Sequence, residues 1–226
     1  MLNNKIIVIT GGSDGLGLET AKILSKENTV IILGRNEDKL KSANLDYCVC
    51  DVTKPELSEE VINKIYDKYG KIDCLINNAG TWIVGQLEEN SFDKISEVID
   101  INVKGVINMT KIIVPYMKKQ GAGLIINIDS TAGVNWKADY SVYTASKWAI
   151  TGFTKAMQSE LLPQGIRVEG FYPGTIQTRL FAKNGLPDKD LTNALKINTA
   201  AKAIKFMVDQ DDDIVITDLG IKHIYN

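Results

Sequence analysis

Length, composition and charge limit what this chain can be. A chain of 226 residues with a hydrophobic content of 44% can bury one substantial core, so a single domain over residues 1–226 is expected. The formal net charge of −2, with acidic and basic residues interspersed, provides no concentrated basic surface and argues against nucleic acid as a partner.

Cysteine usage indicates a reducing compartment. Cys48, Cys50 and Cys74 are odd in number and lie in apolar runs, so we expect buried structural thiols and no disulfide framework. With His223 as the only histidine, no metal site is predicted. Neither a signal peptide nor a run of ~20 apolar residues is evident, so a cytoplasmic protein without membrane contact is expected.

Short apolar runs alternate along the chain with longer segments of helical period. The predicted strands are 5–10, 29–33, 46–50, 73–76, 123–128, 166–171 and 213–217. The predicted helices are 15–26, 36–43, 55–69, 91–118, 141–162 and 199–209. The alternation predicts an α/β fold, a Rossmann-like doubly wound sandwich with about seven mainly parallel strands and helices on both faces. Ligands in such folds bind beyond the carboxyl ends of the strands. The irregular stretch 179–198, which contains Gly185 and Pro187, is predicted to be a mobile loop or short helices over the site.

The junction after the first predicted strand is rich in glycine. It reads Thr10-Gly11-Gly12-Ser13-Asp14-Gly15-Leu16-Gly17 and leads directly into a helix. Glycine lets the backbone approach a ligand closely, and a helix N-terminus offers free N–H groups to a pyrophosphate. A dinucleotide-binding turn is therefore predicted, with an ordinary glycine-rich turn as the alternative. The residues expected to bind the cofactor here are Gly11, Ser13, Asp14, Gly15, Leu16 and Gly17.

The spacing Gly-x-x-x-Gly-x-Gly resembles the first turn of the short-chain dehydrogenase/reductase family. The end of the second strand, Gly34-Arg35-Asn36, lacks the acidic residue that would grip the ribose of NAD. Arg35 could bind the additional phosphate of NADP through paired hydrogen bonds, so NADP(H) is favoured over NAD(H), unless Arg35 is only a solvated surface residue. NADP-preferring relatives often carry a second basic residue where this chain has Asp14.

Later junctions continue the resemblance in the same order. It implies cofactor contacts from Asn36, from Asp51 and Val52 after the third strand, and from Asn78, Ala79 and Gly80 after the fourth. Ile176 and Thr178, which follow the Pro173-Gly174 turn, match positions that hold the nicotinamide carboxamide in relatives. The resemblance covers about residues 5–180.

The pattern Tyr143-Thr144-Ala145-Ser146-Lys147 places a phenol and an ammonium on one helical face. Together with Ser130 at a strand end and Asn102 in Asn-x-x-Gly, it resembles the family's catalytic set. The resemblance implies that Tyr143 is the general acid and base and that Lys147 tunes it and binds the nicotinamide ribose. It also implies that Ser130 polarises the substrate oxygen and that Asn102 holds a water in a proton relay.

Each of these residues has a structural alternative when taken alone. Ser130 could cap a turn, Asn102 could bridge backbone groups, and Lys147 could lie on a solvated helix face. As an ordered set they predict an NAD(P)-dependent oxidoreductase acting on a carbonyl or alcohol. The rival interpretation is a non-catalytic NADP-binding sensor or scaffold, which would typically lose the tyrosine or the lysine.

The departures from the family pattern concern the substrate side and the C-terminus. Asp129 stands where many relatives have serine, Glu169 stands where asparagine is usual, and the last strand lacks an Asp-Gly-Gly ending. A homodimer or homotetramer is implied by the resemblance. The residues that would border an apolar substrate pocket, or else pack in the core, are Trp82, Ile83, Val84, Trp136, Tyr140, Tyr172 and Phe181. The substrate itself stays open, from 3-oxoacyl thioesters to ketones, aldehydes, sugars and steroid-like alcohols.

Overall fold

The computed structural model describes residues 4–183, 186 and 190–225. Gly185 and Pro187 lie outside the described residues, and so does the side chain of Phe181. Within the described part, no helix has the length and apolarity that crossing a bilayer requires. The cysteines are free; Cys50 and Cys74 are buried and Cys48 is half-buried.

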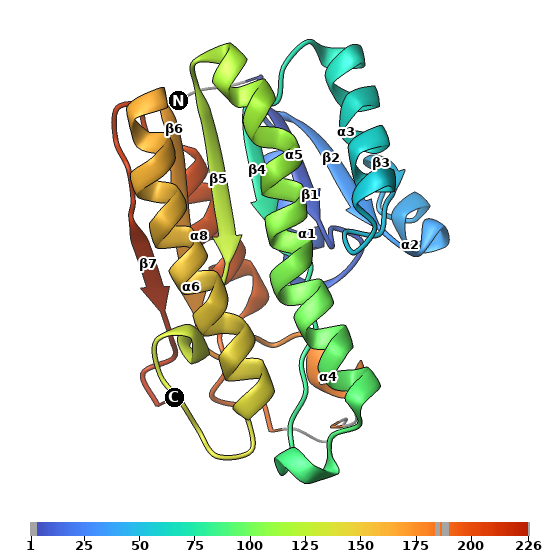
Figure 1. Ribbon diagram of the computed structural model, residues 1–226, viewed down its shortest axis with the longest axis vertical. Helices are drawn as coiled ribbons and strands as arrows, with labels where there is room; N and C mark the ends of the chain where they lie inside the picture. The colour runs from blue at the N-terminus through green and yellow to red at the C-terminus, as the bar shows by residue number, and fades with distance from the viewer. Residues whose placement is uncertain (1–3, 184–185, 187–189, 226) are drawn as a thin grey trace.

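Seven parallel strands form one twisted sheet, as the alternation of strands and helices predicts (Figure 1). In spatial order they are β3 (Asp46–Val49), β2 (Thr29–Gly34), β1 (Ile6–Thr10), β4 (Cys74–Asn77), β5 (Gly123–Ile128), β6 (Ile166–Pro173) and β7 (Asp218–Ile221). The strand order reverses between β1 and β4, because the chain leaves β1 toward β2 and later returns to its other side. That reversal is the point at which ligands bind in doubly wound sheets.

Helices cover both faces of the sheet. α1 (Gly15–Leu24), α2 (Glu37–Lys41) and α8 (Ile197–Val208) pack on one face, where Ile7, Ile9 and Ile32 point. α3 (Pro55–Tyr69), α5 (Gly105–Gln120) and α6 (Ser141–Leu161) pack on the other, where Val8 and Ile31 point. Figure 1 shows α5 and α6 side by side in front of the sheet. Because successive side chains alternate between two covered faces, the strands are apolar throughout.

The long helix predicted over 91–118 is interrupted. The structure has α4 (Phe92–Ile99), one π-helical turn η2 (Asp100–Lys104) and then α5. The Gly105 N–H reaches back five residues to the Asp100 carbonyl, which widens the turn. π-turns of this kind occur often at functional sites, and hydrophobic period alone does not reveal them. Short 3₁₀ segments complete the chain: η1 (Leu87–Glu89), η3 (Thr131–Gly133) and η4 (Leu162–Gln164).

The last strand was predicted over 213–217, which is wrong: β7 spans Asp218–Ile221. The apolar run 213–217 does lie beside β6, but side chains of β6 form hydrogen bonds with its backbone. Arg167 donates to the Ile214 carbonyl at 2.7 Å, and the Glu169 carboxylate accepts from the Ile216 N–H at 3.1 Å. The strand ladder with β6 therefore begins later. The stretch predicted as a loop or short helices over 179–198 contains α7 (Leu180–Lys183).

Glu169 is fully buried on β6, and this has a consequence for stability. Burial raises its pKa to about 7, against the Ile216 N–H and the Arg167 and Lys5 cations, which lower it. A raised carboxyl pKa means that the folded protein binds more protons than the unfolded chain between pH 4.5 and about 7. Stability due to Glu169 is therefore lost as the pH rises through that range.

We expect Glu169→Gln to remove this loss while retaining the acceptor for Ile216. Between pH 6 and pH 8.5 the wild type should lose on the order of 1–3 kcal/mol more unfolding free energy than the variant. Urea denaturation at both pH values measures the difference. If the unfolding free energy fell equally in the wild type and the variant, Glu169 would be ionised across the whole range.

Candidate active site

A cleft opens at the carboxyl ends of the strands, beside the reversal between β1 and β4. It brings together most of the residues predicted from the sequence. Those that line it are Gly11, Ser13, Asp14, Gly15, Leu16, Arg35, Asp51, Val52, Asn78, Ala79, Gly80, Ser130, Tyr143, Lys147, Ile176 and Thr178. Gly17, Asn36 and Asn102 do not line it. They pack against, or form hydrogen bonds with, the segments that form its walls.

The glycine-rich turn fits tightly against the loop that follows β4. Gly11 has a left-handed φ of +65°, and a Cβ there would lie 2.8 Å from the Ala79 Cα. A Cβ on Gly17 would lie 2.4 Å from the Asn78 amide nitrogen and 2.5 Å from the Gly11 carbonyl. The Asn78 amide donates to the carbonyls of Thr10 and Gly11 at 3.0 and 3.1 Å. Two of the three glycines in the spacing are thus required for packing the turn on the next loop.

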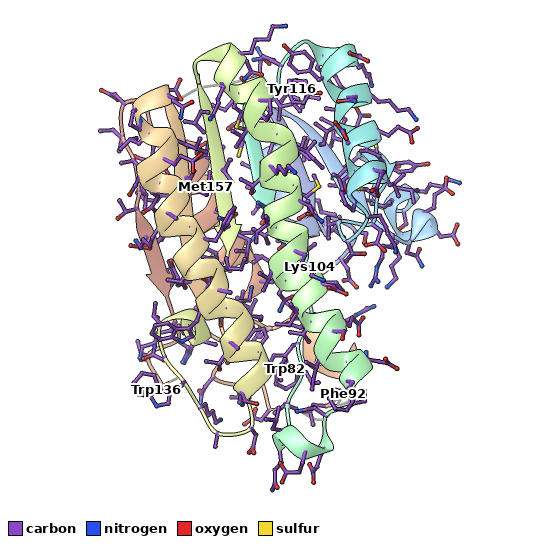
Figure 2. All side chains as sticks on the ribbon, in the orientation of Figure 1. Trp82, Phe92, Lys104, Tyr116, Trp136 and Met157 are labelled. Carbon is purple, nitrogen blue, oxygen red and sulfur yellow. The ribbon has the colours of Figure 1, made fainter. Side chains whose placement is uncertain are left out.

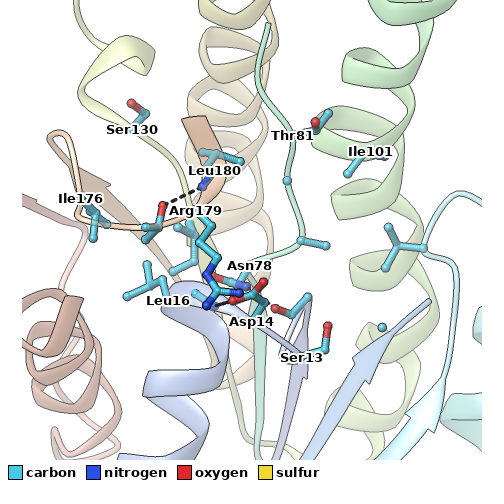
Figure 3. A pocket seen from close by; sticks show the side chains of 18 of the residues that line it. Ser13, Asp14, Leu16, Asn78, Thr81, Ile101, Ser130, Ile176, Arg179 and Leu180 are labelled. Atoms are coloured by element: carbon cyan, nitrogen blue, oxygen red, sulfur yellow. Dashed lines mark hydrogen bonds between the residues drawn. The ribbon is translucent and has the colours of Figure 1, made fainter. Parts of the chain in front are cut away.

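Gly15 marks the open side of the turn. Its φ is +56°, and a Cβ there would meet only Thr178, at 3.9 Å. The N-terminus of α1 begins at this residue, with Asp14 as its N-cap. The Asp14 carboxylate accepts from the Gly15 N–H at 2.7 Å, and the positive end of the helix dipole faces the open gap beside Thr178, which suits an anionic pyrophosphate. Figure 3 shows Ser13, Asp14 and Leu16 at this end of the cleft.

Thr10 was not singled out as a site residue from the sequence, although it precedes the first glycine. Its buried hydroxyl accepts from the N–H groups of Asn78 and Ala79, each at 3.0 Å. It thereby joins the end of β1 to the loop after β4. The signal was a threonine at the end of an apolar strand, where its hydroxyl is free to bind backbone from the neighbouring strand.

The far end of the cleft is formed after β2 and β3. Arg35 is exposed and lines the cleft. Asn36 instead caps α2, because its side chain accepts from the Lys39 N–H at 2.9 Å. Lys39, a residue that the sequence analysis missed, places its ammonium 3.7 Å from the Asp14 carboxylate. Asp51 shapes the turn after β3 by accepting from the Thr53 N–H at 3.0 Å. Two cations, Arg35 and Lys39, thus flank this end.

Arg179 is another cleft residue that the sequence analysis did not single out. It follows Thr178 in the loop after β6, and it is exposed. Figure 3 shows its side chain pointing across the cleft toward Asp14. Only the tertiary structure brings this arginine, more than 160 residues away in sequence, to the glycine-rich turn.

Ser130, Tyr143 and Lys147 converge at the inner end of the cleft. The Ser130 hydroxyl lies near the Tyr143 phenol and acts to lower its pKa. The buried Lys147 ammonium donates to the Ile128 carbonyl at 2.8 Å and lies 5.9 Å from the centre of the Tyr143 ring. One α6 face carries the tyrosine and the lysine, and the end of β5 carries the serine. The arrangement can donate a proton and two hydrogen bonds to a substrate oxygen.

Burial dominates the protonation of this set. It raises the pKa of Tyr143 to about 12, and the Ser130 hydrogen bond opposes that rise. Burial also lowers the pKa of Lys147, which the Asp129 carboxylate opposes. Tyr143 is therefore a phenol at neutral pH, the protonated form that a proton donor must have. From the sequence, Lys147 is expected to have the main influence on the pKa of Tyr143. The structure shows that burial has the larger effect, which residue spacing cannot reveal.

Asn102 lies in the π-turn η2 and is buried. Its side-chain amide donates to the Thr81 carbonyl at 2.9 Å and to the Ser146 hydroxyl at 3.1 Å, and its oxygen accepts from the Thr81 N–H at 2.8 Å. It thus ties the loop after β4 to α6, one residue before Lys147. Its side chain thus makes the backbone contacts that the structural alternative describes.

A second cavity of about 500 Å³ adjoins the cleft and shares Ser130, Tyr143 and Gly174 with it. Trp136 and Tyr140 line this cavity, as expected for a substrate pocket, and Trp136 is 81% exposed. Figure 2 shows Trp136 at the edge of the molecule. The remaining aromatic and aliphatic candidates pack differently: Trp82, Ile83 and Tyr172 are buried, and Val84 lines neither cavity.

With this geometry in place, comparison with known proteins is informative. Residues 5–188 match the family described as short chain dehydrogenase. The chain is 34% identical over 236 residues to the 3-oxoacyl-(acyl-carrier-protein) reductase of Thermotoga maritima. The alignment covers 95% of this chain and 94% of that protein.

Two solved structures share the fold. An alcohol dehydrogenase from the archaeon Thermococcus sibiricus, complexed with 5-hydroxy-NADP, has a TM-score of 0.90 at 26% identity, covering 98% of this chain and 97% of its own. A 3-ketoacyl-(acyl-carrier-protein) reductase from Brucella melitensis, complexed with NADH, also reaches 0.90 at 26% identity, covering 99% of each chain.

The parallel sheet, the glycine-rich turn at its reversal point and the convergence of serine, tyrosine and lysine define the class of the protein, an NAD(P)-dependent oxidoreductase. More particularly, the chain belongs to the short-chain dehydrogenase family.

Proposed function

We propose that this protein transfers a hydride between NADP(H) and a small carbonyl or alcohol substrate, with Tyr143 as the general acid and base. One observation carries the proposal: Ser130 and Tyr143 line both the cofactor cleft and the adjoining cavity. A substrate held in that cavity would place its oxygen on these two hydroxyls and its carbon toward the cleft. The nicotinamide, when bound, supplies or accepts the hydride at that carbon.

The residues of the cleft fit such a cofactor. The open gap between Gly15 and Thr178 suits its pyrophosphate. Ala79 and Gly80 are small, so the backbone after β4 can approach the cofactor closely. Asp51 and Val52 would border the adenine, while Ile176 and Thr178 would hold the carboxamide. Lys147, whose ammonium lies below the Tyr143 ring, would bind the nicotinamide ribose.

During reduction, negative charge accumulates on the substrate oxygen. The Ser130 hydroxyl donates a hydrogen bond to that oxygen and stabilises the charge. The Tyr143 phenol then gives its proton to the oxygen, which yields the alcohol. Lys147, which is positively charged, stabilises the phenolate that remains. Asn102 fixes the helix that carries the lysine through its bond to Ser146. A proton relay at the π-turn that holds Asn102 would resupply the proton.

Activity can be tested by following NADPH absorbance with a panel of ketones, aldehydes and 3-oxoacyl thioesters. The last class is included because the Thermotoga maritima relative is named as a 3-oxoacyl reductase. We expect turnover of at least one class, and loss of that turnover in Ser130→Ala with nucleotide binding intact. Binding of neither NADPH nor NADH would contradict the proposal and leave a non-catalytic role.

Preference for NADP(H) rests on charge at the far end of the cleft. Gly34 occupies the position where an acidic side chain would repel the 2′-phosphate, Arg35 follows it at the cleft, and the Lys39 ammonium lies 3.7 Å from the Asp14 carboxylate. An arginine can bind a phosphate through two parallel charged hydrogen bonds. Asp14, whose carboxylate pairs with Lys39, partly offsets this positive charge.

Arg35→Ala is expected to weaken NADPH binding by about tenfold or more and to leave NADH binding within about twofold, because one charge-assisted contact is worth roughly 1.5–3 kcal/mol. Titration of nicotinamide fluorescence measures both constants. Lys41→Ala is a matched control, since that lysine pairs with Glu37 on α2 and does not line the cleft. Equal weakening of both nucleotides would remove Arg35 from phosphate recognition.

We also propose a cytoplasmic homodimer or homotetramer. The free thiols Cys48, Cys50 and Cys74 suit a reducing compartment, and the outer faces of α5 and α6 expose Ile107 and Trp148. Sedimentation velocity on the wild type and Trp148→Glu tests whether this face joins two copies.

A further inference from the structure

A buried carboxylate, that of Asp129, lines the same cleft as Ser130, Tyr143 and Lys147. It continues β5, where its N–H donates to the Phe171 carbonyl at 2.8 Å, and it is only 3% exposed. One carboxylate oxygen accepts from the Thr151 hydroxyl at 2.7 Å, and the other has no hydrogen-bond partner among the described atoms. A buried carboxylate with one unpaired oxygen is costly to retain, so its charge calls for an explanation.

α6 presents one face to this carboxylate. Tyr143, Lys147, Thr151 and Lys155 are four residues apart and succeed one another along that face. Lys147 donates to the carbonyl of Ile128, the residue just before Asp129, and Thr151 bonds the carboxylate itself. Asp129 therefore sits beside the lysine and tyrosine in a site where water is scarce, and charges act strongly on one another there.

The groups facing Asp129 come from three elements. α6 contributes Tyr143, Lys147 and Thr151; β6 contributes Tyr172, whose buried hydroxyl is also unpaired; and β7 contributes Asp218, which pairs with Lys155. The Asp129 charge raises the pKa of both Lys147 and Tyr143, while Lys147 in turn lowers that of Asp129. Burial still raises the pKa of Asp129 to about 6.

We propose that Asp129 is a positioning residue whose negative charge acts directly on Tyr143 to disfavour its phenolate, biasing the site toward carbonyl reduction. This inference rests on the proposed function of the same site. Reduction requires the phenol as proton donor, whereas alcohol oxidation requires the phenolate as acceptor. A neighbouring negative charge disfavours the phenolate and so opposes oxidation.

The pH at which Asp129 takes up a proton gives the inference a distinctive signature. Below about pH 6 the wild type carries a neutral Asp129 and should behave like Asp129→Asn. Above that pH the two proteins should diverge, because only the wild type has the charge. Asn retains an acceptor for Thr151, so the variant removes the charge with little change in shape.

The kinetic experiment measures kcat/KM for alcohol oxidation from pH 5 to 10 in the wild type, Asp129→Asn and Thr151→Val. We expect Asp129→Asn to oxidise about tenfold faster than the wild type at pH 7.5 and to match it at pH 5, which corresponds to a shift of about one pKa unit in Tyr143. Thr151→Val, which removes the hydrogen bond but keeps the charge, should follow the wild type above pH 8. Superimposable wild-type and Asp129→Asn profiles would overturn the inference.

A second measurement does not depend on turnover. Carbon-13 NMR of protein labelled at aspartate carboxyls follows the Asp129 signal, assigned by its loss in Asp129→Asn. In Lys147→Met the half-titration of Asp129 should move upward by about one unit, because the neighbouring ammonium is gone. An unmoved titration would overturn the inference. A moved titration in a protein with no NADP-dependent turnover would support the coupling and contradict the proposed function, so the two failures are distinguishable.

Discussion

Tyr143→Phe is expected to lower kcat for carbonyl reduction by about 10³-fold, because removal of a positioned proton donor typically costs 10²–10⁴. The ring stays in place against Ile83 and Val142, and only the phenol hydroxyl is lost. NADPH binding should therefore stay within about threefold of the wild type, since a group that acts only in the transition state contributes little to ground-state binding.

Single-turnover measurement of NADPH oxidation, beside fluorescence titration of NADPH, separates the two effects. Tyr140→Phe is the matched control, because Tyr140 lines the adjoining cavity but not the cofactor cleft, and it contacts Trp82. It should retain turnover within about tenfold. Near-wild-type kcat in Tyr143→Phe would assign the proton to another donor.

Gly17→Ala is expected to weaken NADPH binding by about 100-fold or more, because a shift of the turn by ~1 Å is enough to misplace a bound group. The new methyl group would meet a backbone oxygen, Gly11 O, at 2.5 Å as well as the Asn78 amide. A side chain could swing away, but a carbonyl held in the turn cannot, so α1 must shift. That shift would move the N-terminal N–H groups that we propose face the pyrophosphate.

Gly152→Ala provides the control within the same protein. Gly152 lies in α6 and is exposed, and a Cβ there would meet nothing within 4 Å. Because alanine favours helix over glycine by about 0.8–1 kcal/mol, this variant should bind NADPH normally and unfold at a higher urea concentration. If Gly17→Ala bound NADPH like the wild type, the turn would not be the pyrophosphate site.

Much of the fold could be predicted because local patterns agreed with the global arrangement. The apolar runs, the helical period of the segments between them and the glycine-rich junction after the first strand are local features. They predicted β1, α3 and α6 to within a residue or two. The last strand was misplaced because buried side chains of β6, Arg167 and Glu169, bind the backbone of the preceding apolar run. That competition depends on which residues lie opposite, which periodicity does not record.

The sequence by itself determined which chemical groups the site contains and their order along the chain. Tyr143 and Lys147 share a helix face at four-residue spacing, so their proximity required no tertiary information. Tertiary structure alone decided that Lys39 and Arg179 reach the glycine-rich turn, that the helix widens at Asn102, and that Asp129 is buried beside Lys147. The physical reason is that burial and the distances between charges set the pKa values of Tyr143, Lys147 and Asp129, and both arise only when separate strands and helices pack together.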